Sequence, residues 1–78
     1  MSTLRTVKHR YLRTRVALAN TVQKLLDLNR RRHFFKGDAQ QQDSIAEEIK
    51  VLNATADLQH RSMKVYERQI AELQASAA

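Results

Sequence analysis

The sequence predicts an all-α protein in which two long antiparallel helices form a coiled-coil-like helical hairpin. In both halves of the chain, apolar residues recur at alternating spacings of three and four, as they do in helices that pack along their length. The 78 residues include no proline and one glycine, so little interrupts a helix. That glycine lies near the middle of the chain, where a short turn lets the second helix fold back on the first.

The first helix is expected over about residues 3–35. Ser2 and Thr3 are both suitable N-caps, because a hydroxyl can accept from the free amides of a first turn. Gly37 is expected to take the left-handed conformation that ends many helices. The expected core positions are Leu4, Val7, Tyr11, Thr14, Leu18, Thr21, Leu25, Leu28 and Phe35.

The second helix follows a turn at about residues 36–38, and two signals compete for its start. Asp38 with Gln41 has capping-box spacing, and so does Ser44 with Glu47. We favour the earlier start, near residue 39, because residues 39–42 are acceptable helix formers. The helix should run to about residue 75, with residues 75–78 frayed. Its core positions are Ile45, Ile49, Leu52, Ala56, Gln59, Met63, Tyr66, Ile70, Leu73 and Ala77.

This turn position predicts the register of a single domain over residues 1–78. Residues that face each other should have numbers that sum to the high seventies. Phe35 is then opposite Ile45, and Leu18 is opposite Gln59 or Met63.

Each helix also carries a second apolar stripe, a quarter to a third of a turn from its core positions. Isolated surface aliphatics are normal in folded proteins. We favour an interface, because burying a Leu or Val side chain stabilises a protein by about 1.5–3 kcal/mol. A lone hairpin would leave the side chains of both stripes in water. A second copy is the leading occupant, giving a homodimeric four-helix bundle, and a different protein is the other. The stripe residues are Leu12, Val16, Ala19 and Leu26 in the first helix and Val51, Ala54, Leu58 and Val65 in the second.

Charge is distributed unevenly between the two halves. Residues 1–37 hold ten Lys or Arg against one acid, a net +9, and residues 38–78 hold four against seven, a net −3. Basic residues beside aromatics can bind phosphates and stack bases, although cations at a helix C-terminus also complement its dipole. The candidate contacts for an anion or a nucleic acid are Arg30, Arg31, Arg32, His33 and Lys36.

The sequence gives no sign of enzyme chemistry. It has no cysteine, no glycine-rich phosphate loop, and no set of His and carboxylate residues at the spacing of a metal site. We therefore expect no catalytic residues, no cofactor, no metal and no small-molecule substrate. No apolar run approaches the roughly 20 residues of a membrane span, and the N-terminus lacks the apolar core of a secretory signal. We expect a cytoplasmic protein that does not bind membranes.

The region around the turn resembles the small YscE-type co-chaperones of bacterial type III secretion. The resemblance rests on Leu25-Leu26, on Arg30-Arg31-Arg32 and on the run from Lys36-Gly37-Asp38 to Gln42. It implies a short helical hairpin that, with a partner chaperone, keeps a needle subunit soluble in the cytoplasm. The additional stripes would then bind the partner chaperone. Small phage-encoded accessory or host-inhibitor proteins share this architecture by analogy.

The functional prediction is thus a non-enzymatic protein–protein interaction module of the co-chaperone, adaptor or inhibitor type, acting through apolar helix faces. The alternative is a small basic protein that binds nucleic acid through Arg30–Lys36 and an N-terminal cluster of Arg and Lys.

Overall fold

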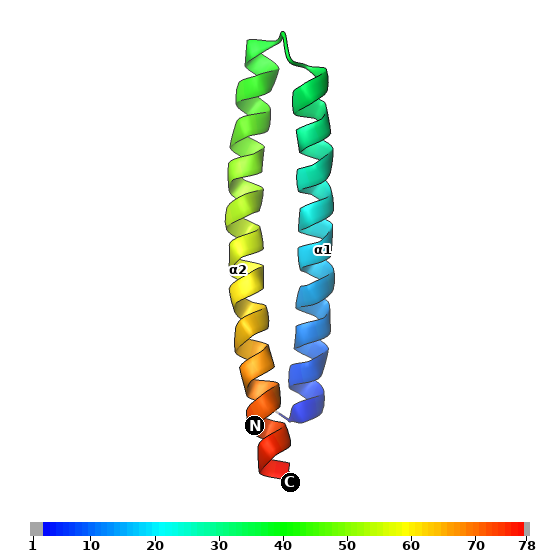
Figure 1. Cartoon of the computed structure of the whole chain (residues 1–78), viewed down its shortest axis with the longest axis vertical. Helices are drawn as coiled ribbons and strands as arrows, with labels where there is room; N and C mark the ends of the chain where they lie inside the picture. Colours follow the sequence, from blue (N-terminus) through cyan, green and yellow to red (C-terminus); the bar gives the residue numbers. More distant parts are fainter. Residues whose placement is uncertain (1–2, 78) are drawn as a thin grey trace.

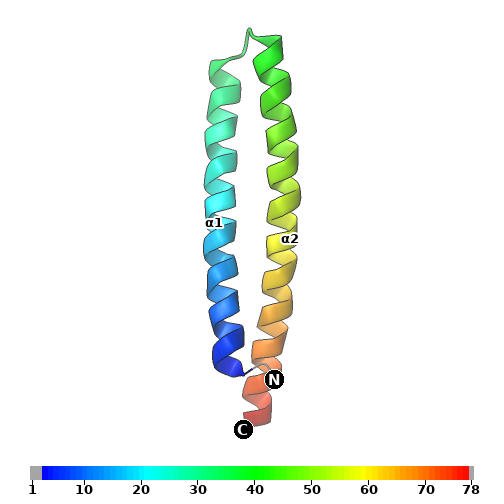
Figure 2. The ribbon, with the colours of Figure 1, turned by 180° about the vertical axis from the view of Figure 1, so that it is seen from behind.

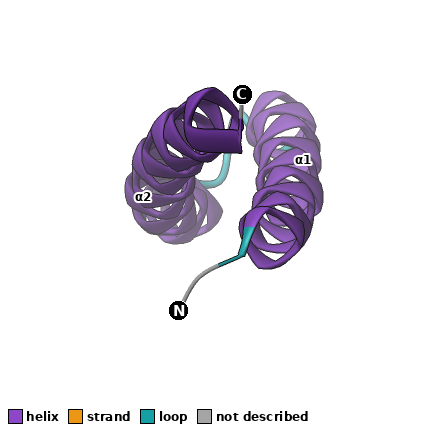
Figure 3. Cartoon of the chain, turned by 90° about the horizontal axis from the view of Figure 1, so that it is seen from below, coloured by secondary structure: helices purple, strands orange, loops and turns teal. Residues whose placement is uncertain are grey.

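The chain is a hairpin of two long helices, as predicted. The computed structural model describes residues 3–77, with α1 over Leu4–Phe34 and α2 over Ala39–Ala77. The helices lie side by side and antiparallel along almost their whole length (Figure 1), and the molecule measures 60 × 16 × 14 Å. Viewed along the helices, the described residues form one layer of two rods with no third element over either face (Figure 3).

Thr3 is the N-cap of α1. It has an extended backbone, and its Oγ1 accepts a hydrogen bond of 3.2 Å from the Thr6 amide. The Thr3 carbonyl accepts the first helical bond, from the Val7 amide at 3.0 Å. Ser2, the other candidate cap, lies outside the described residues.

The end of α1 differs from the prediction. No described glycine has a positive φ, so the expectation that a left-handed Gly37 ends the helix is wrong. Instead, Gln42 Nε2 reaches back from α2 and donates to the Arg32 carbonyl at 2.6 Å and the Phe35 carbonyl at 2.8 Å. Neither carbonyl accepts a hydrogen bond from within a helix. The Gln42 side chain therefore supplies the hydrogen bonds that the backbone amides of a left-handed turn usually donate to the carbonyls at a helix end.

The earlier of the two expected starts is the one that α2 uses. Asp38 Oδ1 accepts from the Gln41 amide at 3.2 Å, and the Asp38 carbonyl accepts from the Gln42 amide at 2.9 Å. The Asp38 amide donates to the Phe35 carbonyl at 3.1 Å, which closes the turn. Ser44 therefore lies inside the helix, and α2 continues to Ala77, two residues past its expected end.

The core is a single narrow seam between the helices. Only four described residues are buried, namely Val7, Thr21, Leu28 and Ile45. All other expected core positions with a described side chain are partly buried, except one. The exception is Phe35, which stays 39% exposed and stacks edge-to-face on Phe34 at 5.2 Å between ring centroids. Its predicted place in the core is wrong because the helix ends before its side chain can turn inward, at the end where the chain crosses between helices (Figure 2).

A polar pair interrupts the apolar seam near its middle. Thr21 Oγ1 lies 2.8 Å from Gln59 Oε1 and 3.0 Å from the Ala17 carbonyl oxygen, and the hydroxyl has one proton to donate. With the Gln59 amide turned over, its nitrogen would donate to Thr21 while Thr21 donates to Ala17, so that each of the two short contacts has its own proton. The residue numbers 21 and 59 sum to 80, just above the high seventies expected from the turn, so Gln59 meets Thr21 rather than Leu18. A partly buried polar contact of this kind favours the alignment in which the two side chains meet.

Replacing Gly37 with Ala should leave the hairpin unharmed or stabilise it by about 0.4–1 kcal/mol, because alanine restricts the unfolded chain. The φ of Gly37 is not positive, and a Cβ built there meets no atom within 4 Å. Urea denaturation followed by circular dichroism measures the effect. A loss of more than about 1 kcal/mol would show that the turn needs the freedom of glycine after all.

Thr21→Val should destabilise the hairpin by about 1–3 kcal/mol, because it leaves the Gln59 amide partly buried without its partner. The double variant Thr21→Val with Gln59→Leu should recover most of that loss, since no polar group is then stranded. Denaturation of the two single variants and the double variant gives the coupling energy. Additive losses in the double variant would contradict a direct contact.

Candidate protein-interaction surface

The stripes predicted outside the core are exposed in the structure. Their six large side chains are 49–64% exposed, and Ala19 and Ala54 are exposed as well. The α1 stripe is Leu12, Val16, Ala19 and Leu26, and the α2 stripe is Val51, Ala54, Leu58 and Val65. Neither hairpin arm covers the stripe of the other.

Val22 completes the α1 stripe, although it is not among the stripe residues predicted from the sequence. It is 44% exposed and lies three residues after Ala19 and four before Leu26. The same three-four spacing that defined the rest of the stripe therefore includes Val22 and closes the gap between Ala19 and Leu26.

The two stripes lie on opposite faces of the hairpin. Leu58 lines a shallow groove with Arg10 and Ala17, and Val51 lines another with Lys24. These three α1 residues each precede a core position by one residue, so they lie about 100° to one side of the core seam.

The residues of the α1 stripe lie on the other side of that seam. Leu12, Ala19 and Leu26 each follow a core position by one residue and therefore lie about 100° away in the opposite direction. The α2 stripe thus shares its face with the opposite side of α1.

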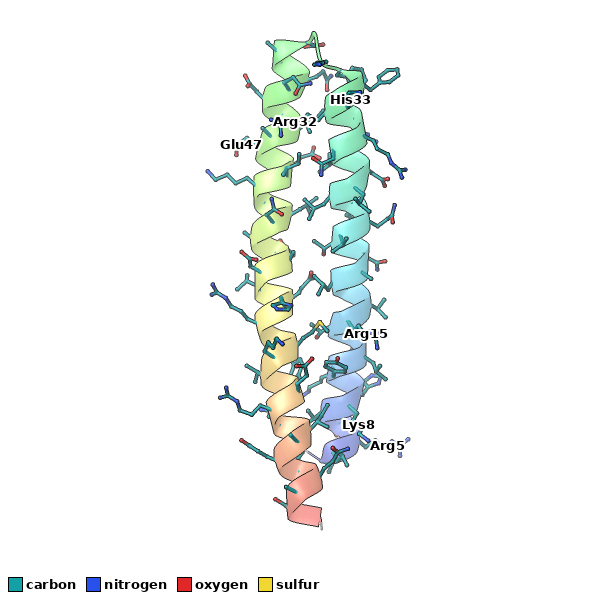
Figure 4. The ribbon with its side chains drawn as sticks, in the orientation of Figure 1. Arg5, Lys8, Arg15, Arg32, His33 and Glu47 are labelled. Atoms are coloured by element: carbon teal, nitrogen blue, oxygen red, sulfur yellow. The ribbon has the colours of Figure 1, made fainter. Side chains whose placement is uncertain are left out.

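The positive charge of α1 is not neutralised by α2. Within residues 3–77, the one ion pair shorter than 4.0 Å joins Lys64 to Glu67, both on α2 and both exposed. Among the described residues, one further polar side-chain contact joins the arms besides the Thr21–Gln59 pair and the Gln42 cap, a long one from Tyr11 Oη to Glu67 Oε1 at 3.4 Å. Arg5, Lys8 and Arg15 come from the N-terminal half of α1 (Figure 4), so basic side chains border the α1 stripe.

The basic residues near the turn do not form one cluster. Arg32, His33 and Lys36 line a shallow depression with Asn29 and Gln42. Arg31 instead borders a groove with Lys24, Asp27 and Glu48, on the face of the α2 stripe, and Arg30 lines neither of these depressions. Phe34, the last residue of α1, is 82% exposed. Arg32, His33 and Lys36 therefore share one depression, whereas Arg31 lines a different groove.

The described part of the chain contains neither a metal-binding group of side chains nor a membrane-spanning helix. Over residues 3–77, no three His, Asp or Glu side chains are grouped so that they could hold a metal ion. Neither described helix contains a stretch that is apolar enough, over a bilayer's thickness, to cross a membrane.

Comparison with protein-family models, with curated proteins and with solved structures gives no match to this chain.

Proposed function

We propose that the protein is a non-enzymatic protein–protein interaction module that acts in the cytoplasm through the α1 and α2 stripes. The observation that carries the proposal is the exposure of six large aliphatic side chains in two ordered rows. Exposed apolar residues scattered singly are common, but rows at helical spacing are what a helix presents to another helix.

The partner is a second copy of the chain, another protein, or both. The resemblance of the turn region to YscE-type co-chaperones supports a role as a co-chaperone, and the hairpin architecture also suits an adaptor or an inhibitor. In each case the chain contributes apolar surface to a partner and performs no reaction. The stripes lie on opposite faces, so binding at one leaves the other accessible.

The double variant Leu12→Glu with Leu58→Glu tests this proposal. Both side chains are more than half exposed, so the hairpin should keep its helicity, while a carboxylate in each stripe should prevent association. Light scattering measures the mass of the wild type and the variant, and affinity purification from the native host measures partner capture. Ser76→Glu is a matched control, since its exposed side chain lies outside both stripes. A wild type that is monomeric at high concentration and captures no specific partner would contradict the proposal.

A second function, nucleic-acid binding, is favoured by the unpaired positive charge of α1. The contacts would be Arg32, His33 and Lys36 near the turn, with Arg30 and Arg31 on other sides of the helix and the N-terminal basic residues as additional charge. No groove-reading geometry accompanies them, so the binding would recognise phosphates rather than sequence.

Binding to duplex DNA or RNA should then weaken steeply with salt, with a slope of about −0.9 per phosphate neutralised in DNA. Arg32→Ala with Lys36→Ala should lower both the affinity and the slope. Lys64→Ala, which removes one exposed cation from α2, is the control and should have a smaller effect. Fluorescence anisotropy over a salt series gives both quantities. Absence of retention on heparin at about 0.1 M salt would exclude this function.

A further inference from the structure

The α2 stripe is the centre of a longer seam on the outer side of α2. This outer seam comprises seven residues at alternating spacings of four and three, and every one of them is exposed. It therefore has the heptad pattern of a helix-packing seam, although α1 packs on a different side of α2. Its residues are Glu47, Val51, Ala54, Leu58, Arg61, Val65 and Arg68. Glu47 lies on the side of α2 that points away from α1 (Figure 4).

We propose that the outer seam binds the outer seam of a second copy, antiparallel, with the two-fold axis of the dimer at Leu58. This inference rests on the proposed function and identifies the occupant of one of its surfaces. In a two-fold antiparallel pair, a residue before the axis meets the residue equally far after it. Val51 and Val65 each lie seven residues from Leu58. The arrangement therefore places Leu58 against its own copy and Val51 against Val65 of the partner, twice.

The charges at the ends of the outer seam select this antiparallel orientation. Glu47 lies eleven residues before Leu58 and Arg68 lies ten after it, a mismatch of one residue, or about 1.5 Å along a helix. Each end of the dimer then has a carboxylate against a guanidinium. A parallel pair would instead place Glu47 against Glu47 and Arg68 against Arg68. Opposite charges beside an apolar seam fix orientation in this way in coiled coils.

The α1 stripe is symmetric too, but its charges oppose the same arrangement. Leu12, Val16, Val22 and Leu26 are spaced evenly about Ala19, so an axis there would also match apolar residues. That axis places Lys8 against Arg30 of the other copy, and α1 contributes one acid, Asp27, against its many bases. Like charges across a contact disfavour it. Self-association therefore uses α2, and α1 stays on the outside of a four-helix assembly.

Disulfide trapping tests the position of the axis. The chain has no cysteine, so an introduced thiol can pair only with its own copy. A disulfide needs Cα atoms about 4.4–6.8 Å apart, which limits trapping to residues beside the axis. Leu58→Cys should form a covalent dimer under mild oxidation, whereas Ala19→Cys, the centre of the alternative pairing, should stay monomeric. Val51→Cys and Val65→Cys should link to each other when mixed and not when oxidised alone.

Charge reversal tests the orientation independently. Glu47→Arg and Arg68→Glu should each weaken dimerisation by about tenfold or more, since each places like charges at both ends of the seam. The double variant should recover most of the wild-type affinity, which a merely structural defect could not produce. Sedimentation over a range of concentrations gives the dissociation constants, and circular dichroism confirms that the helices remain.

The outcomes separate this inference from the proposed function. Trapping at residue 58 together with charge-swap recovery supports the inference. A disulfide dimer formed through residue 19 overturns the inference and leaves the proposed function standing. So does a monomeric wild type that binds another protein when the Leu58→Glu variant does not. A monomer with no specific partner overturns both.

Discussion

Two helices can shield only one side of each other, and the rest of this structure follows from that limit. The solvent-accessible surface of the molecule is 6367 Å², whereas that of a compact protein of 9.1 kDa is about 4,900 Å². Its radius of gyration of 17.5 Å likewise exceeds the roughly 11.5 Å expected for 78 residues in a compact domain. Four buried residues within the described part of the chain are a small core for this many aliphatic side chains. The exposed large aliphatic side chains lie outside the seam, in ordered rows.

Polar contacts align the two arms, because a narrow apolar seam alone tolerates sliding. Thr21 and Gln59 pair near the middle, and Gln42 joins the start of α2 to the last carbonyls of α1. Each contact is lost if one helix shifts by a turn. A defined register matters for the surfaces as well, since it fixes which residues of α1 border the α2 stripe and therefore the charge that a partner meets there.

Periodicity was sufficient to predict the helices, their antiparallel pairing and the exposed stripes, because spacing along a helix determines which residues share a side. The turn was predicted less well. Sequence identified Gly37 and Phe35 by residue type, but the hydrogen bonds of Gln42 decided how α1 ends, and that side chain acts across the turn. Spacing also could not show that the stripes face opposite directions. The direction of each stripe depends on which side of its helix the other arm occupies. The α1 residues that line grooves with Leu58 and Val51 show that side.

Opposite faces give the two stripes different electrostatic surroundings. Lys8 and Arg15 border the α1 stripe. Neither forms an ion pair within residues 3–77, where the one pair joins Lys64 to Glu67. The outer seam of α2 carries a carboxylate at one end and guanidinium groups toward the other, and so complements itself. The first stripe thus has basic borders, whereas the outer seam has opposite charges at its two ends. Under the proposed function, the two surfaces of one hairpin would bind different partners, and a partner on one face would not block the other face.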